Sequence, residues 1–213
     1  MARIAVVAAD GRVARKVITE AVNRGFEVTA FGRKDQNETA TENYIKKDIM
    51  ELTTEDLKKF DAVVDAFAFG AWTEETLPLH SATTNHLADI LSGTNVRLLV
   101  VGGAGSLYVN PEHTVVVADG ADFPDAFKPL ALAMAKVLGE LRKRSDVKWT
   151  YISPAADFQA DGERTGKYIT AGEEFTLNER GESLISYADY AIAMVDEIES
   201  GNHIQKRISV VRA

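Results

Sequence analysis

A single glycine marks the turn between the first apolar segment and the first helical segment, in the stretch IAVVAADGRVA of residues 4–14. The pattern is that of a buried strand, a tight turn and a helix N-terminus, where backbone N–H groups favour a pyrophosphate. The spacing Ala8-x-x-Gly11-x-x-Ala14 keeps one of the three glycines typical of a dinucleotide-binding turn. We therefore predict a dinucleotide site, and the alternative is a strand–turn–helix that binds no ligand. The residues of this turn predicted to contact the cofactor are Ala8, Asp10, Gly11, Arg12 and Val13.

The departures from the glycine pattern differ in their expected effects. Ala14 stands where a glycine allows close helix–strand packing, and alanine is tolerated there. Ala8 fits the turn if its φ is negative, at some cost in room for a phosphate. Asp10 is the strongest departure, because its carboxylate can cap the helix and occupy N–H groups that a phosphate would use. A carboxylate about 5 Å from a phosphate costs roughly 1–3 kcal/mol, much of which Arg12 can offset, while Gly11 is kept where the backbone must come closest.

Two basic residues follow the second apolar strand, which we predict over Glu27–Phe31. In an NAD-preferring site, an acidic residue roughly twenty residues beyond the turn holds the ribose 2′-hydroxyl. Arg33 and Lys34 stand there instead and suit a 2′-phosphate, so we predict NADP(H) in preference to NAD(H). The alternative is a solvated basic pair at a strand end. Asp48, after the short edge strand Tyr44–Lys46, is predicted to lie near the adenine, or otherwise to cap a helix.

The ends of later strands carry the rest of the predicted cofactor site. Small residues after the fourth strand let a ribose pass close to the backbone, and Trp72 behind them is a candidate wall for a flat substrate. Backbone groups at the end of the sixth strand would orient a nicotinamide carboxamide, and Lys128 would help to bind phosphate or substrate. The cofactor contacts predicted in these segments are Ala68, Phe69, Gly70, Lys128, Ser153, Pro154 and Ala155.

Alternating strand and helix patterns predict the elements that position these residues. The predicted strands are Ile4–Val7, Glu27–Phe31, Tyr44–Lys46, Asp61–Phe67, Arg97–Val101 and Lys148–Ile152, and the predicted helices are Val13–Arg24, Thr54–Lys59, Thr76–Ser92 and Asp125–Arg144. Runs such as LLVV lack alternation, as expected for strands buried on both faces of a parallel sheet. Repeated βα units with right-handed crossovers predict an α/β fold with a doubly wound parallel sheet of Rossmann type.

The last third of the chain is richer in glycine and charge. We predict a single domain over residues 1–213, with a small C-terminal cap region over residues 155–185 on the substrate side of the strand ends. A helix is predicted over Ser186–Ser200, with Ser186 as its N-cap and Asp189 completing a capping box. A final strand is predicted over Arg207–Val211.

Composition excludes several classes of protein. A net charge of −8 and a sequence pI of about 5.1 argue against a general nucleic-acid binder or a membrane-surface protein. The chain has no cysteine, hence no disulfide framework and no thiolate chemistry. It has no long apolar run, no signal-peptide pattern and no metal-binding motif. We predict a cytoplasmic protein, a monomer or homodimer, that acts on a small molecule.

Longer stretches carry a family resemblance over nearly the whole chain. The segments IAVVAADGRVA, LLVVGGAGSLYV, FPDAFKPLALAMAKVLGELR, WTYISPAADFQADGERTGKY and ISYADYAIAMVDEIE resemble the NmrA-like atypical short-chain dehydrogenases, within them the NADH-flavin reductase group, and are more distantly similar to biliverdin reductase B. The specific motifs are residues 102–107 and 162–168. The resemblance implies NAD(P)H binding, with Gly102 and Gly103 among the cofactor contacts, and reduction of a flavin or quinone. This sequence departs from the family at Ala8, Asp10 and Ala14, where glycine, threonine and glycine are usual.

The residues available limit the chemistry. Standard short-chain dehydrogenases use a Tyr-x-x-x-Lys pair on the helix after the fifth strand, and residues 125–144 contain no tyrosine. Hydride transfer to a flavin such as FMN or FAD needs less from the protein, because the two ring systems carry the chemistry once they are stacked. We predict Ser106 and Tyr108 as the catalytic residues that donate a hydrogen bond to the acceptor, and the alternative is that both are turn residues. His113 is either a proton source or a solvated loop residue.

Two functions of different classes follow. The leading hypothesis is an NAD(P)H-dependent reductase that transfers a hydride to a flavin, a quinone or a similar flat acceptor, with NADPH favoured. The alternative is a non-catalytic NAD(P)-binding redox sensor of NmrA type. An isomerase or dehydratase would need an acid–base pair that the sequence does not display.

Overall fold

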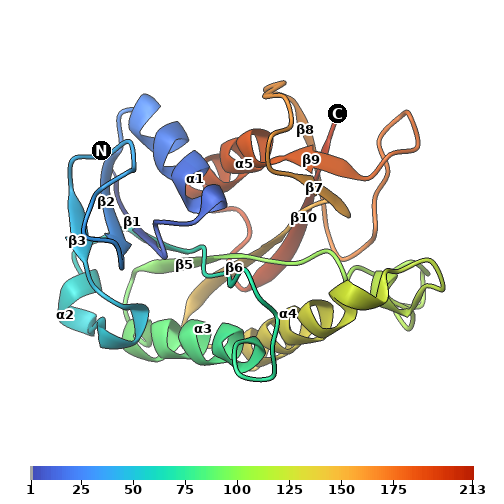
Figure 1. The fold of residues 1–213 in the computed structure, drawn as a ribbon, viewed down its shortest axis with the longest axis horizontal. Helices are drawn as coiled ribbons and strands as arrows, with labels where there is room; N and C mark the ends of the chain where they lie inside the picture. Colours follow the sequence, from blue (N-terminus) through green and yellow to red (C-terminus); the bar gives the residue numbers. More distant parts are fainter. Residues whose placement is uncertain (1) are drawn as a thin grey trace.

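A computed structural model describes residues 2–213 and places eight strands in one main sheet (Figure 1). The strand order is β3-β2-β1-β4-β5-β6-β10-β8, and every pairing is parallel except that of β10 with β8. The strands of this sheet are β1 (Arg3–Val7), β2 (Glu27–Gly32), β3 (Tyr44–Lys46), β4 (Ala62–Asp65), β5 (Arg97–Val101), β6 (Lys148–Ser153), β8 (Tyr168–Ala171) and β10 (Lys206–Arg212). A separate parallel pair joins β7 (Asp157–Gln159) to β9 (Leu184–Ser186).

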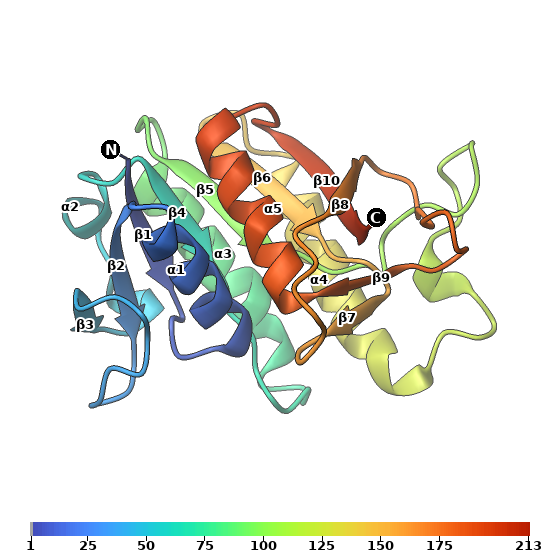
Figure 2. The same cartoon turned by 90° about the horizontal axis from the view of Figure 1, so that it is seen from above.

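Helices cover both faces of the sheet. Figure 2 shows α1 (Arg12–Asn23) and α5 (Tyr187–Ser200) side by side in front of it, with α3 (Leu77–Leu91) and α4 (Lys128–Leu141) behind. The shorter helical turns are α2 (Thr54–Leu57), η1 (Ile49–Glu51), η2 (Val117–Asp119) and η3 (Asp125–Phe127). The predicted α/β class with a doubly wound, mostly parallel sheet is confirmed.

Alternation along β1 shows how the two layers share the sheet. Ile4 and Val6 are fully buried in the core beneath α1 and α5, whereas Ala5 and Val7 are fully buried in the opposite core with residues of α3 and α4. A strand that must be apolar on both faces carries an unbroken apolar run, which explains the lack of alternation in the sequence.

Some predicted boundaries differ from the observed ones. The predicted strand Asp61–Phe67 is shorter, because the buried Asp65 carboxylate accepts a hydrogen bond from Phe67 N at 3.1 Å and turns the chain away from the sheet. The predicted helix Asp125–Arg144 divides into η3 and α4, with Pro129 in the first turn of α4. Proline lacks the N–H that a continuous helix would need, so it suits a helix start.

The segment predicted as a cap has two structural parts. β7 and β9 form the small separate sheet just beyond the carboxyl end of β6, whereas β8 joins the main sheet as its edge strand (Figure 2). Ser186 is the N-cap of α5, as predicted, and its Oγ accepts a hydrogen bond from Asp189 N at 3.0 Å. The predicted capping box is wrong, because the Asp189 carboxylate accepts hydrogen bonds from Thr165 N and Gly166 N, both at 2.9 Å. Asp189 therefore ties the segment between β7 and β8 to the start of α5.

None of the helices described within residues 2–213 has the length and apolar character needed to cross a membrane.

Candidate functional site

The turn after β1 has a left-handed residue at its start. Ala8 has φ +53°, so the negative φ under which alanine would fit this turn without strain is not what the structure shows. Gly11 N donates to Ala8 O at 3.1 Å and closes the turn, which requires the chain to reverse at Ala8. Glycine adopts this conformation freely, whereas an L-residue is strained by roughly 1–2 kcal/mol. The first glycine of the usual pattern is therefore replaced at a position where its absence stores strain.

Restoring that glycine tests this account. The substitution Ala8→Gly is expected to raise the free energy of unfolding by about 0.5–1 kcal/mol, because relief of the left-handed strain exceeds the added entropy of the unfolded chain. Ala14→Gly is the matched control, since it restores another motif glycine inside a helix and is expected to lower stability by about 1 kcal/mol. Urea denaturation measures both changes, and a less stable Ala8→Gly variant would contradict the strain.

Asp10 does not cap α1, which corrects the sequence-based expectation. Its Oδ2 accepts hydrogen bonds from Arg33 N at 2.7 Å and Lys34 N at 3.3 Å, and its Oδ1 accepts one from Tyr44 Oη at 3.0 Å. Gly32 permits this approach, because a Cβ there would lie 2.8 Å from each Asp10 carboxylate oxygen. Burial and the hydrogen bond to Asp10 raise the pKa of Tyr44 to about 12.

The N-terminus of α1 is consequently available to an anion. Gly11 is its N-cap residue, and within residues 2–213 no side chain caps the helix. A Cβ on Gly11 would meet Ala8 O at 3.4 Å, an ordinary contact, so internal packing does not demand glycine there. Arg12 lies in the first turn with its guanidinium 5.7 Å from the centre of the Tyr187 ring, and Val13 follows it. The first-turn N–H groups, which no side chain of residues 2–213 caps, and the helix dipole give this end its capacity for phosphate.

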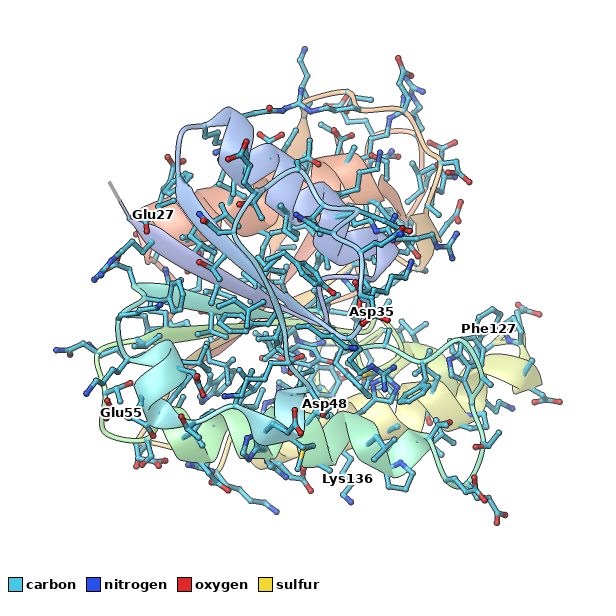
Figure 3. The ribbon with its side chains drawn as sticks, turned by 60° about the vertical axis from the view of Figure 1, so that its left-hand side comes forward. Glu27, Asp35, Asp48, Glu55, Phe127 and Lys136 are labelled. Carbon is cyan, nitrogen blue, oxygen red and sulfur yellow. The ribbon has the colours of Figure 1, made fainter. Side chains whose placement is uncertain are left out.

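Basic residues cluster where β2 ends. Figure 3 shows Asp35, just past this cluster, at the opposite end of β2 from Glu27. The Arg33 side chain is 66% exposed, lies 3.9 Å from an Asp48 carboxylate oxygen and stacks 5.8 Å from the centre of the Phe69 ring. Asp48 is also the N-cap of η1, accepting a hydrogen bond from Met50 N at 2.9 Å. The structure thus brings together residues from the ends of β2, β3 and β4.

The segment after β4 carries exposed and aromatic residues. Ala68 and Gly70 are exposed, and the Phe69 ring packs edge-on against Phe67 at 5.4 Å. Farther along, the rings of Trp72 and Phe127 approach to 5.1 Å, and both are exposed. Figure 3 shows Phe127 at the same side of the molecule as Asp35.

Lys128, at the start of α4, pairs with Asp125 at 2.7 Å. Among residues 2–213 it forms no ion pair or hydrogen bond with another predicted site residue.

The ends of β5 and β6 are linked by side-chain hydrogen bonds. Ser153 Oγ donates to Gly103 O at 2.8 Å, and Gly103 N donates to Tyr151 Oη at 2.9 Å. A Cβ on Gly102 would lie 2.7 Å from Tyr151 Cζ, so this glycine is required by packing. Ser153, Pro154 and Ala155 are buried.

The predicted catalytic residues surround a buried arginine. The Arg207 side chain is 0% exposed, pairs with Glu173, and donates a hydrogen bond to Ser106 O at 3.1 Å. Its guanidinium lies 5.9 Å from the centre of the Tyr108 ring. Ser106 Oγ is buried and has no hydrogen-bond partner within residues 2–213. Ser106 and Tyr108 are therefore positioned by one cation from β10.

Sequence reasoning missed a histidine–carboxylate pair beside Tyr108. The His113 ring stacks on Tyr108 with 4.5 Å between ring centres, and His113 Nε2 lies 2.8 Å from Glu174 Oε1. The hydrogen bond from His113 lowers the pKa of the Glu174 carboxyl. His113 is thus not a lone residue in its loop. Its partner Glu174 is 61 positions away, so no local sequence pattern predicts the pair.

Two further observations concern a hollow elsewhere on the molecule and the residues that could hold a metal ion. A hollow of about 350 Å³ opens at the opposite, amino edge of the sheet, and none of the predicted site residues lines it. Across residues 2–213, no group of three or more His, Asp or Glu side chains is arranged to hold a metal ion.

Comparisons with known proteins show the family and the fold of this chain. A family model described as NAD(P)H-binding matches residues 8–200. The Bacillus subtilis protein YwnB, itself uncharacterized, is 40% identical over 213 residues, with 98% of each chain covered. The crystal structure of a putative NADH-flavin reductase from Streptococcus pneumoniae is 52% identical, covers 100% of both chains and superposes with a TM-score of 0.95. A short-chain dehydrogenase/reductase from Veillonella parvula, solved in complex with NADP, shares the fold alone, at 17% identity, with 99% and 94% of the chains covered and a TM-score of 0.70.

Proposed function

Because the chain belongs to the NAD(P)H-binding family, as its resemblance implied, we propose that it is an NAD(P)H-dependent reductase. It transfers a hydride to a flavin, a quinone or a similar flat acceptor, and it prefers NADPH. The observation that carries the proposal is the uncapped N-terminus of α1 beside the basic end of β2, which Asp10 leaves available by turning away from the helix. The name of the streptococcal relative supports a flavin as the acceptor.

Different parts of the dinucleotide are bound by residues at the ends of different strands. The N–H groups after Gly11 receive the pyrophosphate. Arg33 and Lys34 face the adenosine 2′-phosphate. The other proposed contacts, from adenine to nicotinamide, are Asp48, Ala68, Phe69, Gly70, Gly102, Gly103, Lys128, Ser153, Pro154 and Ala155. When bound, the nicotinamide supplies the hydride.

The acceptor side is aromatic and polar. Trp72 and Phe127 offer two exposed rings against which a flat molecule packs. Tyr108 donates a hydrogen bond to the acceptor. Ser106, predicted in the same role, has a buried Oγ and instead ties this segment to Arg207 through its carbonyl oxygen. His113, held by Glu174, supplies the proton that accompanies the hydride when a quinone is reduced. NADPH, a proton and the quinone thus give NADP⁺ and the hydroquinone.

The preference for NADPH is tested at Arg33. The substitution Arg33→Ala is expected to weaken NADPH binding about tenfold and to leave NADH binding unchanged, because a charge-assisted contact to the 2′-phosphate is lost. Calorimetric titration measures both affinities, and Lys136→Ala, an exposed cation on α4, is the control (Figure 3). Equal losses for both cofactors would contradict the assignment to the 2′-phosphate.

Turnover separates the proposal from its alternative. The absence of a tyrosine from α4 (Lys128–Leu141) favours a non-catalytic NAD(P)-binding redox sensor of NmrA type. Oxidation of NADPH by the purified protein with FMN, FAD or a quinone supports the reductase. Binding of NADP⁺ and NADPH with similar affinity and no turnover with any of these acceptors supports the sensor.

A further inference from the structure

A carboxylate of this chain already binds two cations, one at the basic end of β2 and one on α1. Glu38, in the segment between β2 and β3, accepts a hydrogen bond from Lys34 Nζ at 2.8 Å through Oε2, and the same oxygen pairs with Arg15 of α1. These two cations hold the pKa of the Glu38 carboxyl below its ordinary value. One oxygen held by two cations from different elements is the arrangement that a phosphate oxygen would adopt.

The position of the two cations makes them available to a 2′-phosphate. Lys34 directly follows Arg33 at the end of β2, where the ribose of a dinucleotide lies in this fold, and Arg15 projects from the first turns of α1. Asp10 accepts hydrogen bonds from the backbone N–H groups of Arg33 and Lys34, so a ligand at this site would contact their side chains and not these N–H groups.

The ion pairs of Glu38 with Arg15 and Lys34 are exposed enough to be replaced by pairs with a ligand. The side chains of Arg15, Lys34 and Glu38 are 35%, 47% and 45% exposed. Ion pairs of this exposure are weak and are screened by salt, so a doubly charged phosphate displaces a singly charged carboxylate from them. The neighbouring Asp35 pairs instead with Lys46 at 2.5 Å, and so does not compete for these two cations.

We propose that Glu38 is a specificity-determining residue that competes with the 2′-phosphate of NADP(H) for Arg15 and Lys34. This inference rests on the proposed function and deepens it. NAD(H), which lacks the 2′-phosphate, binds without displacing Glu38. The preference for NADP(H) over NAD(H) is therefore smaller than Arg15, Arg33 and Lys34 would give without Glu38.

The test is the substitution Glu38→Gln, which keeps the size and polarity of the side chain and removes its charge. It is expected to tighten the binding of NADP⁺ and of 2′,5′-ADP about threefold to tenfold at low salt, and to leave NAD⁺ and 5′-AMP unchanged. The gain is expected to disappear near 1 M salt. Glu42→Gln is the matched control, because Glu42 is exposed in the same segment and forms no ion pair within residues 2–213.

The outcomes separate this inference from the function on which it rests. Weaker binding of NADP⁺ by Glu38→Gln would mean that Glu38 holds the two cations in place for the ligand, and would overturn the competition. An equal gain for NAD⁺, no gain, or a gain that persists at 1 M salt would overturn it as well. Failure of the wild-type protein to bind either dinucleotide would instead overturn the proposed function itself.

Discussion

Replacing Arg207 with methionine is expected to lower the free energy of unfolding by about 3–5 kcal/mol. The Arg207 side chain is completely buried, and its guanidinium bonds to the Glu173 carboxylate and to the Ser106 and Glu173 carbonyl oxygens. Methionine fills similar space but donates no hydrogen bond. Glu173 is then left partly buried with less than its full charge compensation, and two carbonyl oxygens lose a donor.

A second arginine on Glu173 provides the control. Arg142 pairs with the same Glu173 oxygen at 2.6 Å but is 40% exposed, so Arg142→Met is expected to cost less than about 1 kcal/mol. The double variant Arg207→Met/Glu173→Gln is expected to be more stable than Arg207→Met, because it removes a carboxylate that then has Arg142 as its one remaining cation among residues 2–213. Urea denaturation measures all three, and a loss below 1 kcal/mol for Arg207→Met would show that the buried pair matters little.

The same substitution separates binding from chemistry. Arg207 touches the segment of Ser106 and Tyr108 and donates a long hydrogen bond, 3.4 Å, to Ser153 Oγ at the nicotinamide end, but it contacts none of the residues proposed to hold the adenosine half of the cofactor. If the proposed function is correct, Arg207→Met lowers the rate of acceptor reduction far more than it weakens NADPH binding. Titration of the folded variant with NADPH gives its affinity for the cofactor, and turnover with FMN gives the rate of acceptor reduction.

Local patterns predicted most of the fold, because an apolar run between glycine-containing turns needs no distant partner to be recognised as a strand. The N-cap at Ser186 was equally readable, since it depends on a hydrogen bond to Asp189 three residues away. The role of Asp10 was not readable. Its partners at Arg33 and Lys34 become neighbours only when β1 and β2 pair, and Gly32 then makes room for the carboxylate.

The candidate site likewise contains residues that the sequence predicts and residues that it does not. Residues at strand ends follow from topology, since parallel strands deliver their carboxyl ends to one edge. The left-handed φ of Ala8 follows from closure of the turn, which favours glycine but does not exclude alanine. The pair of the buried Arg207 with Glu173 and the pair of His113 with Glu174 join positions 34 and 61 residues apart. Neither pair leaves a spacing that a single sequence displays.

The substitution Gly102→Ala is expected to lower the free energy of unfolding by about 2–3 kcal/mol, as overpacking of a rigid core does. The new Cβ would lie 2.7 Å from Tyr151 Cζ and 2.8 Å from Tyr151 Cδ1. The Tyr151 ring is fully buried, and its hydroxyl accepts from Gly103 N at 2.9 Å and donates to Met134 O at 3.2 Å. Because both hydrogen bonds hold the ring, the backbone at the end of β5 must move instead.

Gly139→Ala is the matched control, because a Cβ there meets nothing within 4 Å in the interior of α4 and is expected to raise stability by about 0.5–1 kcal/mol. A second variant, Gly102→Ala/Tyr151→Leu, is expected to lose less stability than the sum of its single substitutions, since the smaller side chain frees the space that the new Cβ needs. The displaced backbone carries Gly103 and, through it, the hydrogen bond from Ser153 Oγ. If the ends of β5 and β6 hold the nicotinamide, Gly102→Ala weakens the binding of NADPH and of NADH equally, whereas Arg33→Ala weakens the binding of NADPH alone. The two variants together would then assign the nicotinamide half and the adenosine half of the dinucleotide to opposite ends of the same sheet edge.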